Sequence, residues 1–244
     1  GARYARRVGA KLVPWMMDLN PDEAVAAGWL REGSMMESFL RNQLERSLRQ
    51  SAAIIALDRF MGDRIAAKGI DHGKIHVLAP WAHENEVRPD PEGSKAFRAR
   101  HGLEGSFVVM YSGNHSPCHP LSSVVDAAIR LKDEDKVRFL FVGGGTGWAE
   151  IRRIKERENL TNVICLPYQP LKKVGASLGA ANLHIVAMGD PFVGLVHPCK
   201  VYNLLSLGLP FVVVGPGESH LGDLLKELGE GSGCVGVRHG DGAA

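Results

Sequence analysis

The sequence predicts an α/β fold, in which a doubly wound parallel sheet follows a partial α/β domain. Short runs of Val, Ile, Leu and Phe alternate along the chain with segments of helical apolar spacing. Strands as apolar as these are typical of a parallel sheet covered by helices on both faces. The 244 residues, 45% hydrophobic and 23% charged, provide enough apolar surface for one large or two ordinary domains.

The first 78 residues predict three strands and two helices. The strands are expected at residues 11–17, 52–56 and 75–78, and the helices at residues 34–50 and 58–68. In the first helix we expect the apolar stripe of Met35, Met36, Phe39 and Leu40 to be core rather than a membrane or partner face.

Residues 79–96 then interrupt the alternation with prolines and acidic residues and no periodicity, which predicts a domain boundary. We therefore divide the chain into residues 1–85 and 86–244. Because it starts at Gly1 rather than Met and stops directly after a strand-like run, we expect it to be a fragment of a longer protein.

Beyond the boundary the alternation resumes. Strands are expected at residues 107–111, 137–142, 163–166, 183–186, 211–214 and 234–237, and helices at residues 121–131, 149–156, 171–180, 198–208 and 221–228. Ligands of such sheets bind beyond the carboxyl ends of the strands. The loops expected there are residues 112–120, 143–147, 167–170, 187–197 and 215–220.

The most informative segment is residues 194–217, which predicts a loop, a short helix and a buried strand. It places Lys200 in the first turn of the helix and His197 just before it. A helix N-terminus attracts anions and disfavours cations, so a lysine there suggests a bound anion, first of all a diphosphate. The alternative is a surface lysine that reaches solvent. Tyr202 and Asn203, one turn on, either take ribose or sugar hydroxyls or simply pack.

A second polar loop, residues 112–120, contains Gly113, Asn114, His115 and His119. Its glycine would let backbone approach a ligand and its histidines would donate to phosphate oxygens; the alternative is a turn-rich loop with capping residues. No acidic residue completes a ligand set, so no metal site is predicted.

Two further features are ambiguous. The glycines of residues 143–147 favour a tight strand-to-helix turn over a dinucleotide fingerprint, because no acidic residue ends the next strand. Asp18, at the end of the first clear strand, either faces a cleft or makes an Asx-turn or helix cap.

Composition narrows the partners. The net charge of +2 and the absence of any Lys/Arg run longer than two residues argue against a nucleic-acid partner. The four cysteines lack C-x-x-C spacing, which argues against a zinc site or a disulfide framework and favours a reducing, cytoplasmic setting. No apolar run reaches membrane-spanning length and no signal peptide is visible; peripheral association with the inner face of a membrane stays open.

With these residues in place, the sequence resembles the family 4 glycosyltransferases of the GT-B fold. The matching segments are Tyr-Ser-Gly-Asn-His-Ser at 111–116, Phe-Leu-Phe-Val-Gly-Gly-Gly at 139–145, Asn-Val-Ile-Cys-Leu-Pro-Tyr-Gln-Pro at 162–170, Ala-Ala-Asn-Leu-His-Ile-Val at 180–186 and the segment 194–217. Residues 17–22, 51–57 and 74–81 resemble the end of the acceptor domain and the interdomain link. The resemblance implies a Rossmann-like C-terminal donor domain that lacks its last helix, after a partial N-terminal acceptor domain.

The resemblance also implies roles for individual residues. Gly113 and Asn114 would lie under the diphosphate of a nucleotide sugar, the base would stack near Tyr168 and Gln169, and Lys200 would neutralise the leaving diphosphate without a metal. Backbone N–H groups of Gly194, Leu195 and Val196 would complete the donor site. We take Lys200, His119 and Asp18 as the catalytic candidates.

The sequence departs from the family pattern at several places. Leu195 and Asn203 stand where many members carry two glutamates, which puts contacts to the sugar and ribose hydroxyls in doubt. The phosphate-binding Arg and Lys of the Gly113 loop are absent, and His115 and His119 are the nearest substitutes, so that a proton-dependent phosphate grip is conceivable. Met17 replaces a histidine before Asp18.

The expected function is transfer of a sugar from a UDP- or GDP-linked donor to a glycan or lipid-linked acceptor in polysaccharide biosynthesis, with retention of configuration and no cofactor or metal. Retention follows from the resemblance alone. Two alternatives are a non-catalytic nucleotide-sugar binding module and a GT-B-fold nucleotide-sugar epimerase, which would need acidic groups for proton abstraction. The loops offer Asp190 and Glu218 but no evident pair.

Overall fold

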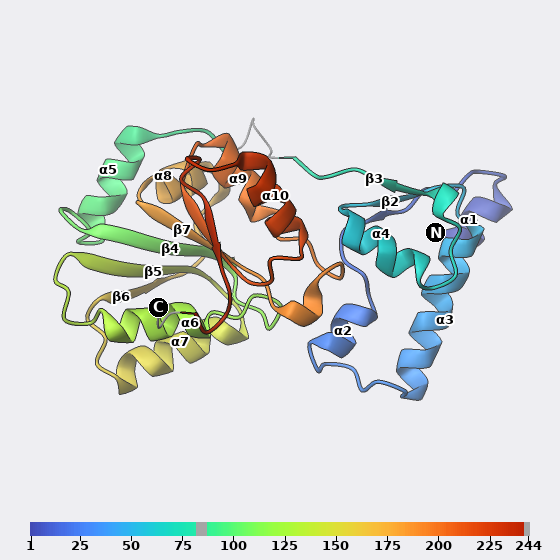
Figure 1. Ribbon diagram of the computed structural model, residues 1–244, viewed down its shortest axis with the longest axis horizontal. Coiled ribbons are helices and arrows are strands. Elements are labelled where there is room, and N and C mark those ends of the chain that lie inside the picture. Colours follow the sequence, from blue (N-terminus) through green and yellow to red (C-terminus); the bar gives the residue numbers. More distant parts are fainter. Residues whose placement is uncertain (82–86, 242–244) are drawn as a thin grey trace. The chain divides into compact units, whose positions relative to one another are not determined.

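The computed structural model describes residues 1–81 and 87–241 of the chain, which form two compact units (Figure 1). The first unit comprises Gly1–Pro80 and Asp190–His197, and the second comprises Trp81–Gly189 and Pro198–Ala244. The boundary expected between residues 85 and 86 lies outside the described residues.

The first unit is built on a small parallel sheet of order β1-β2-β3. Its strands are β1 (Trp15–Met16), β2 (Ile54–Ala56) and β3 (Ile75–Val77), and its helices are α1 (Ala2–Arg7), α2 (Asp22–Ala26), α3 (Met35–Gln50), α4 (Arg59–Ala66) and the short 3-10 helices η1 (His72–Lys74) and η3 (Asp190–Phe192). Side-chain caps start α3 and α4: Ser34 accepts from the N–H of Glu37, and Asp58 accepts from that of Met61. The strand expected over residues 11–17 is shorter, because only Trp15 and Met16 pair with β2.

The segment 190–197 packs on the first unit although it follows strands of the second. Leu195 is buried in the core of the first unit, and its carbonyl accepts from the N–H of Leu19 at 2.7 Å. The side chain of Arg64 donates to the carbonyl of Val193 at 3.2 Å. Gly194 has a φ of +73°, and a Cβ there would lie 2.6 Å from the carbonyl oxygen of Phe60. The segment is therefore held by close backbone packing.

The apolar stripe of α3 does not lie in the core, contrary to the expectation. Met35 is 90% exposed, and Met36, Phe39 and Leu40 are also exposed. The helix instead turns Leu44 and Leu48 toward the core of the first unit. The apolar residues of α3 are spread over more than one face of the helix. Their periodicity alone therefore does not show which of them are buried.

The second unit contains a parallel sheet of order β6-β5-β4-β7-β8-β9. The strands are β4 (Phe107–Asn114), β5 (Val137–Gly144), β6 (Val163–Leu166), β7 (Leu183–Ala187), β8 (Phe211–Val214) and β9 (Val235–Val237); the helices are α5 (Pro91–Arg100), α6 (Ser122–Arg130), α7 (Thr146–Arg157), η2 (Leu171–Lys173), α8 (Val174–Gly179), α9 (Lys200–Ser206) and α10 (His220–Leu228). Strand order reverses between β4 and β7, and α6 and α7 lie on one side of the sheet with α8 and α9 on the other (Figure 1). This confirms the doubly wound sheet, whose ligands bind where the order reverses.

One helix of the second unit was missed by the sequence analysis. α5 begins inside residues 79–96, where no element was expected. Its start is marked by a capping signal rather than by periodicity: the carboxylate of Asp90 accepts from the N–H of Gly93 at 2.9 Å, and Pro91 occupies the first turn. Among the described residues, no helix is both long and apolar enough to cross a bilayer.

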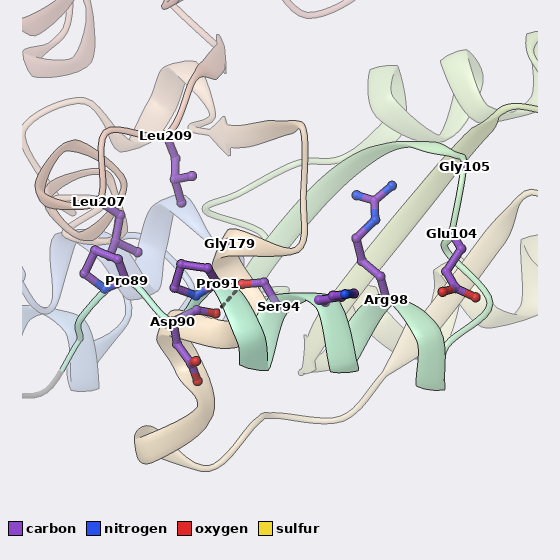
Figure 2. Close-up of a pocket in the computed structure, with 12 residues that line it drawn as sticks. Pro89, Asp90, Pro91, Ser94, Arg98, Glu104, Gly105, Gly179, Leu207 and Leu209 are labelled. Carbon is purple, nitrogen blue, oxygen red and sulfur yellow. Dashed lines mark hydrogen bonds between the residues drawn. The ribbon is translucent and has the colours of Figure 1, made fainter.

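A cavity of about 530 Å³ lies beside α5 (Figure 2). Its lining includes Ser94, Arg98, Gly179 and Leu209. Gly179, Glu104 and Leu209 precede β7, β4 and β8, so the cavity is at the amino ends of these strands, away from the expected donor site. The guanidinium of Arg98 is already engaged by protein acceptors: it donates to the carbonyls of Ala180 (2.7 Å), Leu103 (2.9 Å) and Ser106, and to the side chain of Asn182 (3.2 Å). We therefore interpret Arg98 as a structural anchor of the second unit.

Replacement of this anchor is expected to destabilise the second unit. Arg98→Met would leave several partly buried carbonyls without a donor, at a cost of about 2 to 3 kcal/mol in the free energy of unfolding. Urea unfolding of the Arg98→Met and Arg100→Met proteins measures the effect, because Arg100 lies on the same helix but is exposed. Equal midpoints for the two variants would contradict the interpretation.

Candidate nucleotide-diphosphate site

The candidate site begins where β4 and β5 end together. The two strands pair over eight residues, the last pairs being Gly113 with Gly143 and Asn114 with Gly144. Gly113 and Asn114 are therefore strand residues, which corrects the expected loop start at residue 112. The strands extend this far because a Cβ at Gly143 would lie 2.0 Å from the carbonyl oxygen of Gly113, so only glycine permits the pairing.

The turn after β5 is tight, as expected. Gly145 has a φ of +116° and precedes α7, and a Cβ there would lie 2.6 Å from the side-chain oxygen of Asn114. The N–H of Gly147 donates to the carbonyl of His115 at 2.9 Å. These glycines allow the segment that follows β4 and the start of α7 to lie close together at the carboxyl edge of the sheet.

Lys200 is the first residue of α9; the residue as a whole is half-buried, and its ammonium nitrogen is fully buried. Its Nζ lies 3.8 Å from the centre of the Tyr111 ring, and a Cβ on Gly113 would lie 2.9 Å from it. Within the described part of the chain, Nζ has no hydrogen-bond partner. Burial lowers the pKa of Lys200 to about 7. The surface-lysine alternative is therefore wrong: this lysine is a desolvated cation that lacks an acceptor, and the seven residues of α9 add little dipole.

His115 and His119 lie in the same part of the second unit, and Lys200 acts on both electrostatically. The Nδ1 atoms face the carbonyl oxygens of Gly113 (3.0 Å) and Ala187 (2.8 Å). A carbonyl only accepts, so each Nδ1 carries the hydrogen and the neutral ring offers a lone pair at Nε2. Burial, aided by the charge of Lys200, lowers the pKa of each histidine to about 4. Donation to a phosphate oxygen would therefore require uptake of a second proton.

The buried histidines are expected to make the protein acid-sensitive. The folded pKa of His119, about 4, lies below the ordinary value near 6.5, so the unfolded chain binds more protons between these pH values. The stability that His119 contributes is full above about pH 6.5 and is lost as the pH falls toward about 4. His119→Gln should remove roughly 1 to 2 kcal/mol of the stability lost between pH 7 and pH 5.

Urea unfolding at pH 7, 6 and 5 would test this, with the exposed His72→Gln variant as the control. A His119→Gln protein that loses as much stability as the unmodified one over this range would contradict the prediction.

Tyr168 and Gln169 follow β6 at the same edge of the sheet. Tyr168 is exposed, and its ring would be 3.1 Å from a Cβ placed on Gly144. Gln169 donates its side-chain N–H to the carbonyl of Pro167 at 2.9 Å, which stiffens this turn. Tyr202 and Asn203 are half-buried on α9. The ring of Tyr168 thus has an open position beside the ends of the strands, as stacking on a base requires.

The remaining predicted site residues lie in the first unit. His197 Nδ1 is 2.7 Å from a carboxylate oxygen of Asp58, and both side chains are buried. Partial burial raises the pKa of Asp18, and the charge of His197 opposes that rise. Gly194, Leu195 and Val196 pack with the first unit, where Leu195 and Val196 are buried.

Two residues around these groups were missed by the sequence analysis. Asp58 offered only the signal of a helix cap, and Tyr111 only that of a buried strand residue. Tyr111 was quoted within the resembling segment 111–116, but nothing in its spacing indicated contact with Lys200, 89 positions later in the numbering.

Comparison with known proteins supports the resemblance. No protein-family model matches the chain. It is 25% identical over 235 residues to WcaI of Escherichia coli (strain K12), named as a colanic acid biosynthesis glycosyl transferase, and the match covers 95% of the chain and 58% of WcaI. The structure of HepE from Anabaena in complex with UDP matches 99% of the chain and 62% of HepE, with a TM-score of 0.76 and 16% identity.

A second solved structure gives the same result. WaaG, a glycosyltransferase involved in lipopolysaccharide biosynthesis, matches 98% of the chain and 67% of its own length, with a TM-score of 0.68 and 13% identity. The chain spans less than two thirds of WcaI and of HepE. The expected fold class is confirmed: the chain has the GT-B fold that these solved glycosyltransferase structures share.

Proposed function

We propose that this chain is part of a glycosyltransferase that moves a sugar from a nucleotide-diphosphate donor to a glycan or lipid-linked acceptor, with retention of configuration and without a metal. The donor is UDP- or GDP-linked. The observation that carries the proposal is the buried ammonium of Lys200, which lacks an acceptor among the described residues and lies at the carboxyl edge of a doubly wound sheet. Similarity to WcaI and to the UDP-bound HepE supports it.

The chemistry follows from the charge that develops on the leaving group. When the bond between the sugar and the diphosphate breaks, negative charge increases on the departing oxygens. An ammonium that is already desolvated and fixed stabilises that charge without reorganisation of solvent. Binding of the diphosphate also gives Nζ of Lys200 the hydrogen-bond acceptors that it lacks. The same contact therefore raises the affinity for the donor and stabilises the leaving diphosphate.

The other residues receive roles by their place in the second unit. Gly113 offers a surface without a side chain next to Nζ, and Asn114 lies beside it; we assign both to the diphosphate. Tyr168 stacks on the base and Gln169 supports the turn. Tyr202 and Asn203 on α9 bind ribose or sugar hydroxyls, while the lone pairs of His115 and His119 accept from donor hydroxyl groups.

The residues of the first unit keep their proposed roles in part. The N–H groups of Leu195 and Val196 donate to the carbonyl of Phe192, at 2.9 Å and 3.2 Å, so of the three expected backbone groups only that of Gly194 keeps a donor-binding role. His197 supports this segment, and Asp18 positions the sugar or the acceptor. Peripheral association with the inner face of a membrane is part of this proposal for a lipid-linked acceptor.

Calorimetric titration with UDP, GDP and ADP at pH 7 tests the donor site. We expect one of the uracil or guanine nucleotides to bind with one site per chain, and inorganic sulfate at the same ionic strength not to displace it. If the unmodified protein binds none of the three nucleotides, the donor-site proposal is wrong.

One observation favours a second candidate, a non-catalytic nucleotide-sugar binding module. Leu195 is buried in an apolar core and stands where many relatives carry a glutamate. The two candidates differ in turnover: release of free nucleotide from UDP-glucose, in the presence of a glycan or lipid acceptor, supports the transferase. Nucleotide binding without release under any acceptor supports the binding module.

A further inference from the structure

Tyr111 lies directly under the ammonium of Lys200. The distance of 3.8 Å from Nζ to the ring centre is within the range of a cation–π interaction. The tyrosine is 1% exposed, so the contact is made away from water. A desolvated contact of this kind is stronger than one on a surface.

The ring cannot easily move away from this position. Tyr111 is paired with Phe141 of β5 in the centre of the sheet, and its hydroxyl donates to the carbonyl of Asn114 at 2.7 Å. The rings of Tyr111 and His115 make a T-shaped contact, with centroids 4.7 Å apart and an interplanar angle of 72°. Three restraints therefore fix the face on which the ammonium rests.

The ring of Tyr111 also gives the buried Nζ of Lys200 a partly negative surface, which its other described neighbours do not provide. Among the described residues no hydrogen-bond acceptor is offered to the ammonium, and burial penalises its charge. The negative face of an aromatic ring attracts a cation but does not saturate its three N–H donors. The lysine is thus held while its donors stay free for a ligand.

We propose that Tyr111 is a positioning residue, whose ring face holds the Lys200 ammonium beside Gly113 in readiness for an anion and whose hydroxyl fixes the backbone of Asn114. Only the naming of this anion as a diphosphate rests on the proposed function. The contact between ring and ammonium stands on the geometry of the second unit alone.

The test changes the electron density of the ring and leaves its shape nearly the same. Tyr111 is replaced by Phe in one protein and by 3,4,5-trifluorophenylalanine in another, and the pKa of Lys200 is measured without nucleotide from the carbon-13 shift of its ε-carbon. The Lys200→Met protein assigns the signal. We expect the fluorinated ring to lower the pKa of Lys200 by about one unit relative to Phe, because its face no longer attracts the cation. The signal of exposed Lys226 serves as the internal control.

The nucleotide arm separates the two proposals. If UDP or GDP binds, its affinity at pH 8 should fall about tenfold from the Phe to the fluorinated protein, in step with the lost charge on Lys200. Equal pKa values of Lys200 in both proteins would overturn the role of Tyr111, whatever the nucleotide result. A shifted pKa in a protein that binds no nucleotide would support the role of Tyr111 and reject the donor site.

Discussion

Lys200→Met is expected to abolish nucleotide binding and, at the same time, to stabilise the protein without ligand. Removal of a buried charged partner of a diphosphate costs about 2 to 5 kcal/mol, which is roughly a thirtyfold to several-thousandfold loss of affinity. In the free protein, however, the ammonium is buried without a hydrogen-bond acceptor among the described residues. Methionine fills a similar volume without that penalty, so the thermal midpoint should rise by several degrees.

The gain in stability should depend on pH in a defined direction. Burial places the folded pKa of Lys200 at about 7, below the ordinary value of 10.5, so the unfolded chain binds more protons between these limits. The stability of the unmodified protein therefore rises with pH from about 7 to about 10.5. The advantage of Lys200→Met should shrink over the same interval, which urea unfolding at pH 7, 8.5 and 10 would measure.

Lys226→Met is the matched control for this prediction. The Lys226 side chain is 66% exposed and lies 3.7 Å from Glu218 and 3.8 Å from Asp223. Its replacement should leave nucleotide affinity unchanged and alter stability by no more than about 0.5 kcal/mol. If the Lys200→Met protein binds nucleotide as tightly as the Lys226→Met control, Lys200 does not contact the nucleotide. If it is less stable than the unmodified protein at pH 7, burial of the Lys200 charge does not destabilise the free protein.

The sheet could be predicted because its strands carry a strong local signal. Each predicted apolar run overlaps a strand of the structure, and the runs Val163–Leu166 and Phe211–Val214 have the predicted bounds. Elements whose bounds depend on a capping residue or on the neighbouring strand were predicted less well. α5 depends on Asp90 and Pro91, and the ends of β4 and β5 depend on Gly113 passing close to Gly143.

The candidate site could be predicted in part for the same reason. Lys200 stood out because a cation is unfavourable near the N-terminus of a helix, where the dipole is positive. This signal is visible in the local sequence. The burial of Lys200 against Tyr111 is a contact between distant strands and helices, and spacing along the chain does not encode it. The protonation of His115 and His119 depends on carbonyl neighbours that only the folded chain supplies.

Gly143→Ala is expected to disrupt the site by separating the ends of β4 and β5. Gly143 has a φ of +139°, and an added Cβ would lie 2.0 Å from the carbonyl oxygen of Gly113, which belongs to the backbone and cannot rotate away. Backbone strain of 1 to 3 kcal/mol and overpacking of 1 to 3 kcal/mol together give a loss of about 4 kcal/mol in the free energy of unfolding. Movement of Gly113 would also displace the surface beside the ammonium of Lys200, so nucleotide binding should weaken more than tenfold.

Gly208→Ala is the control that separates the effect of backbone strain from that of a steric clash of the added Cβ. Gly208 has a φ of +64°, but a Cβ there would meet no atom within 4 Å. Its replacement should cost only about 1 to 2 kcal/mol, the penalty of the left-handed conformation, with nucleotide affinity unchanged. Both variants would be compared by urea unfolding and by calorimetric titration. If Gly143→Ala cost no more than Gly208→Ala, the contact between the ends of β4 and β5 would not be the constraint that shapes the site, because strain at one residue would then account for the whole effect.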